Sequence, residues 1–129
     1  MFSKMLAVLM AWLALTAGPA LADIKDYEFF LIEGEFREAD DVVIRVALVD
    51  KRSGTPVPNA VVFARRIDMA PDGMPAMDAP LEPVQAEEPG VYAFATSLMM
   101  AGGWELSLAA KVQGEEGTVV TKLSVKVVP

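Results

Sequence analysis

Apolar and polar residues alternate along most of the chain after residue 22, and this period of two constrains the fold more than any other feature. Segments 41–50, 91–98 and 104–112 show it most clearly. In an extended strand, successive side chains point to opposite faces, so each segment predicts one face packed on a core. The expected core faces are Val42, Ile44, Val46 and Leu48; Tyr92, Phe94 and Thr96; and Trp104, Leu106, Leu108 and Ala110.

Turn signals separate these segments at short intervals. Residues 51–59 hold Ser53-Gly54 and two prolines, and residues 113–117 read QGEEG, typical of a hairpin turn. Further strands are expected at 27–36, 59–67 and 118–128, and a short edge strand runs from 81 into a turn at 90. About seven strands and no convincing helix after residue 22 predict an all-β, immunoglobulin-like antiparallel sandwich.

Segment 68–80, DMAPDGMPAMDAP, interrupts the alternation. Its three prolines and one glycine exclude a regular helix or a central strand, so we expect a loop that carries Met69, Met74 and Met77. Met99 and Met100 fall in a second predicted turn, at 99–103. These five are the only methionines after residue 22.

The first 22 residues predict a secretory signal peptide. Lys4 precedes the apolar run 6–17, and Ala20-Leu21-Ala22 supplies the small-residue cleavage pattern. The run is short for a membrane span, although an uncleaved anchor remains the alternative. We therefore expect one domain at 23–129, periplasmic or secreted, after a signal peptide at 1–22.

Charge and residue absences narrow the function. The segment after residue 22 has ten basic and eighteen acidic residues, about −8 in net charge, which excludes nucleic acid and direct membrane binding as partners. The chain contains no cysteine and no histidine, so thiolate or serine–histidine catalysis and zinc sites are excluded. No carboxylate pair is placed for acid–base chemistry, and we expect no enzymatic activity.

Three ordered motifs resemble the YtkA-like and FixH-like family of small exported β-domains. They are the methionine–proline segment after a strand, then Gly90-Val91-Tyr92, then the turn Met100-Ala101-Gly102-Gly103-Trp104. The resemblance spans roughly residues 41 to 128. It implies an immunoglobulin-like sandwich outside the cytoplasm, associated with copper handling and with assembly of respiratory oxidases. FixH-like proteins typically keep a membrane anchor, whereas the leader of this chain is predicted to be cleaved.

The methionines are candidate ligands for copper(I), because thioether sulfur is a soft donor that suits cuprous ion. Pro75 favours a four-residue turn that brings Met74 and Met77 within about 7 Å. The predicted metal site is Met74, Met77 and Met100, with Met69 or Met99 as a spare donor and Trp104 covering the ion through its ring face. Flexible core packing and a protein-docking patch are the alternatives.

The acidic residues of segment 68–80 give a weaker signal. Asp68, Asp72 and Asp78 flank the methionines but lack the spacing and the closing glutamate of a calcium loop. The sequence thus favours a copper(I)-binding or copper-delivery module with a copper-accepting or membrane-complex protein as partner. The alternative is a structural accessory domain that binds no metal and docks onto a membrane, respiratory-oxidase assembly or export complex.

Overall fold

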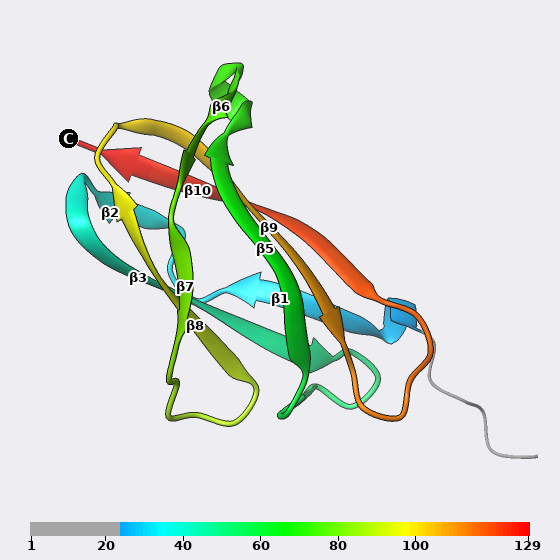
Figure 1. The fold of residues 1–129 in the computed structure, drawn as a ribbon. Helices are drawn as coiled ribbons and strands as arrows, with labels where there is room; N and C mark the ends of the chain where they lie inside the picture. Colours follow the sequence, from blue (N-terminus) through cyan, green and yellow to red (C-terminus); the bar gives the residue numbers. More distant parts are fainter. Residues whose placement is uncertain (1–23) are drawn as a thin grey trace, which may run out of the picture.

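The computed structural model describes residues 24–129, which form two β-sheets packed face to face (Figure 1). The signal peptide predicted at 1–22 lies outside the described residues. Within them, no helix is long and apolar enough to span a membrane. The elements are η1 (Ile24–Asp26), β1 (Tyr27–Leu31), β2 (Glu35–Arg37), β3 (Ala39–Asp50), β4 (Thr55–Pro56), β5 (Val61–Met69), η2 (Ala70–Asp72), β6 (Met74–Ala79), β7 (Leu81–Val84), β8 (Val91–Leu98), β9 (Gly102–Lys111) and β10 (Val119–Val128).

One sheet has the strand order β1-β3-β8-β7, and β4 pairs with the end of β3. The other has the order β2-β10-β9-β5-β6. All neighbouring strands are antiparallel except β2, which runs parallel to β10. The predicted all-β sandwich is confirmed, and apolar packing between the sheets holds it together.

The alternation in the sequence defines the core. Val42 is almost fully buried, and Ile44, Val46 and Leu48 are fully so, whereas Val43 on the opposite face of β3 is exposed. β9 supplies the facing layer. Its alternate residues Trp104, Leu106, Leu108 and Ala110 are buried, as are Phe29, Phe94, Ile67, Val125 and Val127 from other strands.

β3 begins earlier than its apolar pattern suggests. The alternating segment begins at 41, but β3 starts at Ala39 and pairs with Leu98 of β8. The register shifts between Ala39 and Val42, and the Ser97 hydroxyl donates a hydrogen bond of 2.9 Å to Asp40. A bulge and a side-chain partner therefore admit acidic residues at the strand end.

The largest departure from expectation lies in segment 68–80. We predicted a loop, but Met74–Ala79 forms the edge strand β6, paired with the end of β5. Because β6 has a neighbour on one side only, Pro75 can be accommodated despite its missing N–H group. The chain reverses earlier, at η2, where the Gly73 N–H donates to the Ala70 carbonyl at 2.9 Å.

Candidate metal site

Segments far apart in the sequence meet at one end of the sandwich, drawn at the top in Figure 1. We call this the methionine end; it consists of residues 68–78 and the β8–β9 turn at 99–103. Met69 and Met74 are Cα partners across β5 and β6. The Met69 methyl group lies so close to Gly102 that a Cβ there would stand only 2.9 Å from it. The structure thus confirms that the methionine segment and the 99–103 turn share an end.

Burial divides the five methionines into two kinds. Met69 is fully buried in the core at 0% exposure. Met74, Met77, Met99 and Met100 are 39%, 41%, 61% and 41% exposed. Flexible packing accounts for Met69. It does not account for the other four, whose side chains remain accessible to solvent.

Trp104 lies at the start of the buried face of β9 and is only 4% exposed. Its indole N–H donates a hydrogen bond of 2.9 Å to the Met100 carbonyl. The ring is therefore part of the core, as packing alone would require, and its polar edge fixes the backbone of the turn. Trp104 supports the turn that bears Met99 and Met100.

Met74 and Met77 lie in the edge strand β6 rather than in a loop, and their closeness across a four-residue turn stays a prediction. Asp68 pairs with Asp78, and the next residue of β5, Met69, pairs with Met74. Three residues of β6, at 75–77, are consequently extra in the register and form a wide bulge. A bulge in an edge strand therefore brings this part of the chain to the surface, where Met74 and Met77 are exposed.

Asp68 and Arg66 organise the base of the bulge. Asp68 is buried, and its carboxylate accepts hydrogen bonds from Arg66 Nε and from the Ala70 N–H, both at 2.8 Å. The Arg66 hydrogen bond, opposed by burial and aided by Ala70, lowers the pKa of Asp68. The same contact with Asp68 raises the pKa of Arg66. Asp68 is therefore ionised at neutral pH and fixes the start of η2.

Asp72 fastens the other end of η2 to β9. Its Oδ2 accepts a hydrogen bond of 3.1 Å from the Gly103 N–H. Pro71 also lies close, since a Cβ at Gly103 would stand 3.1 Å from the Pro71 Cβ. Gly102 has a φ of 140°, and a Cβ there would collide with the Asp72 carboxylate. The two glycines therefore permit η2 to lie against β9.

Carboxylates do not form an alternative metal centre in the described part of the chain, where no three histidine, cysteine, aspartate or glutamate side chains are grouped for one ion.

The sequence did not predict that Arg66, Asp68 and Asp72 hold this end of the fold together through hydrogen bonds. An arginine and an aspartate two residues apart share one face of a strand, and this spacing was the available signal for Arg66 and Asp68.

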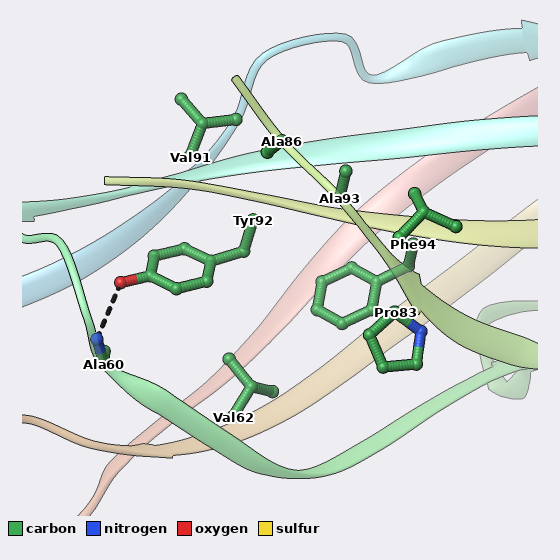
Figure 2. A pocket seen from close by; sticks show the side chains of 9 residues that line it. Ala60, Val62, Pro83, Ala86, Val91, Tyr92, Ala93 and Phe94 are labelled. Carbon is green, nitrogen blue, oxygen red and sulfur yellow. Dashed lines mark hydrogen bonds between the residues drawn. The ribbon is translucent and has the colours of Figure 1, made fainter. Parts of the chain in front are cut away.

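A well-formed hollow also exists, but it lies away from the methionines. It has a volume of about 270 Å³ between β5, β7 and β8 and is lined mainly by apolar side chains (Figure 2). Its one hydroxyl, that of Tyr92, accepts from the Ala60 N–H at 2.9 Å and donates to the Val57 carbonyl at 2.7 Å. Since the hydroxyl proton is already used, Tyr92 has no free donor to orient a ligand.

Comparison with known protein families identifies the family of the chain. The YtkA-like family model matches residues 21–109, more than half of the chain, and the chain belongs to that family. No curated protein matches the sequence.

Solved structures give distant likenesses only. The Lin-41 filamin domain has a TM-score of 0.48 at 16% identity, covering 78% of this chain and 91% of that one. The adhesin InvE of Yersinia pseudotuberculosis has a TM-score of 0.47 at 18% identity, covering 83% of this chain but 27% of the adhesin. The ZirS C-terminal domain has a TM-score of 0.45 at 9% identity, covering 88% and 83%. We draw no functional argument from similarities at this level.

Proposed function

We propose that this protein is an exported copper(I)-binding or copper-delivery module that holds the ion at the methionine end. The observation that carries the proposal is the exposure of Met74, Met77, Met99 and Met100 at one end of a rigid sandwich. Four accessible thioethers are more than core packing requires, and the fold orders both segments that bear them.

The donor set selects the metal. Thioether sulfur is soft and uncharged, so it favours copper(I) over zinc, calcium or magnesium. It also needs no deprotonation, so binding is expected to vary little with pH. Segment 66–78 holds three aspartates, Asp68, Asp72 and Asp78, against one arginine, Arg66, so its net negative charge would favour a bound cation.

The test is competition for copper(I) against a colorimetric cuprous chelator under reducing, anaerobic conditions, using the domain at 23–129. The wild type is expected to withdraw copper from the chelator, and Met74→Leu/Met77→Leu is expected to compete at least tenfold less well, because each lost thioether removes a donor. Leucine keeps the apolar volume, so a docking or packing role would survive the change.

A matched control is available at the opposite end of the same sheet. Val61 and Val120 are also exposed, at 58% and 70%, and Val61→Leu/Val120→Leu changes apolar surface without touching a sulfur. This control should compete like the wild type. Absence of competition by the wild type would refute copper binding and favour a metal-free accessory domain that docks onto a membrane or export complex. Undiminished competition by the methionine double variant would refute the site.

A further inference from the structure

A single side chain, Arg66 of β5, ties together the segment that carries two of the exposed methionines. Its Nε donates to Asp68 Oδ2 at 2.8 Å, its Nη1 to Asp78 Oδ2 at 3.2 Å, and its Nη2 to the Pro75 carbonyl at 2.7 Å. Each of the three guanidinium nitrogens has an acceptor. The three acceptors lie on β5, at the base of the bulge and within the bulge itself.

The bulge depends on such a tie because the strand ladder does not hold it. Residues 75–77 have no Cα partner on β5 in the observed register, and Pro75 has no N–H to donate. The Pro75 carbonyl instead receives the Arg66 proton. Without that bond, the segment between Met74 and Asp78 would have more conformations available to it.

We propose that Arg66 is a positioning residue for copper(I) binding, which fixes the β6 bulge so that Met74 and Met77 are presented beside the 99–103 turn. This inference rests on the proposed function. A segment ordered before binding loses less conformational entropy when it closes on an ion, so the affinity is higher. The planar fork of arginine is required, because a lysine ammonium cannot reach three acceptors in one plane.

The experiment compares Arg66→Gln and Arg66→Lys with the wild type in the same chelator competition, together with thermal unfolding of each protein. Loss of a residue that supports metal ligands typically weakens binding by about 10–100-fold, and we expect Arg66→Gln to fall in that range. Arg66→Lys should recover only part of the affinity. The number of ions bound should stay the same, since every sulfur is still present.

The chain offers a matched control for the loss of an exposed arginine. The Arg45 side chain is 43% exposed, against 49% for Arg66, and pairs with Glu33 at 2.9 Å on the other sheet. Arg45→Gln is expected to bind copper(I) like the wild type. ¹³C signals of the methionine methyl groups in the metal-free protein provide a second readout, in which Arg66→Gln should perturb Met74 and Met77 more than Met99.

The outcomes separate this inference from the proposed function. If the wild type does not bind copper(I), both are overturned. If the wild type binds through Met74 and Met77 but folded Arg66→Gln binds equally well, only the positioning role of Arg66 is overturned. Should Arg66→Gln fail to fold, Arg66→Lys keeps the positive charge but cannot serve all three acceptors, and wild-type affinity in that variant would overturn the inference equally.

Discussion

Strand β8 joins two ends of the sandwich that are closed by opposite chemistry. At its start, Tyr92 lines an apolar hollow, where its hydroxyl accepts from the Ala60 N–H (Figure 2) and donates to the Val57 carbonyl. Beyond its last residue, Leu98, the methionine end is tied by the ionised carboxylate of Asp68 and carries exposed thioethers. At one end the Tyr92 hydroxyl is fully used by the fold, whereas at the other the thioethers of four methionines remain exposed.

The two ends should also respond to pH in opposite directions. Burial raises the pKa of Tyr92, so the folded state favours the neutral phenol. Arg66 lowers the pKa of Asp68, so the folded state favours the carboxylate. Alkali should therefore weaken the Tyr92 end and acid should weaken the methionine end.

The largest effect is expected from Met69→Ala, which tests whether the methionine end contains one core residue among surface ones. Met69 is fully buried, so truncation leaves a cavity and should lower the free energy of unfolding by about 2–5 kcal/mol. Met99→Ala, at a 61% exposed position, is the control and should stay within about 0.5 kcal/mol of the wild type. Chemical denaturation measures both. An equal loss of unfolding free energy in the two variants would contradict the division of the methionines into one buried and four exposed residues.

Tyr92→Phe tests the contribution of the Tyr92 hydroxyl to stability at the opposite end of the sandwich. Removing the hydroxyl leaves the Val57 carbonyl and the Ala60 N–H without this partner and should cost about 1–3 kcal/mol at pH 7. Because the pKa of Tyr92 is higher in the folded than in the unfolded chain, its contribution is present below pH 10 and is lost as the pH rises through the folded-state value.

Denaturation midpoints measured from pH 7 to 11 test the predicted loss of the Tyr92 contribution at alkaline pH. The variant should lose less stability than the wild type above about pH 10. Some alkaline loss should persist, since burial and then Glu115 raise the pKa of Tyr27 as well. A variant with an unchanged alkaline profile would contradict a role for the Tyr92 phenol in that loss.

Asp68→Asn makes the corresponding test at the methionine end and should cost about 1 kcal/mol at pH 7, the scale of one weakened hydrogen bond. The pKa of Asp68 is lower in the folded chain, so its contribution is present above pH 4 and is lost as the pH falls through the folded-state value. The stabilities of the wild type and the variant should draw together as the pH falls below 4. A gap that does not narrow on acidification would show that the carboxylate charge is not what matters.

A strand can be predicted from the sequence when its local pattern, rather than long-range contacts, determines where it forms. Alternation predicts where β3, β8 and β9 lie and most of their buried residues, although not the first residues of β3. β6 could not be predicted in this way. Its position is fixed by pairing with β5 and by the hydrogen bond from Arg66 to the Pro75 carbonyl, contacts that no local pattern encodes.

The candidate site was likewise predicted in part. The two methionine-bearing segments were predicted to contribute to one site, and the structure brings Met69 and Asp72 of the first against Gly102 and Gly103 of the second. The burial of Met69 did not follow, since segment 68–80 gave no indication that β5 would extend to it. Local composition identifies soft donors, whereas long-range packing decides which of them remain exposed.

The smallest effect, and the sharpest test of the comparison, is that of Met74→Leu/Met77→Leu on the metal-free protein. Both residues are exposed and leucine is close to methionine in volume, so the free energy of unfolding should change by no more than about 0.5 kcal/mol. Chemical denaturation of the metal-free proteins measures it. Destabilisation well above that limit would mean that the two sulfurs pack against the fold, making the methionine end as structural as the Tyr92 end. If stability is unchanged while copper(I) affinity is lost, the thioethers are retained for binding rather than for folding.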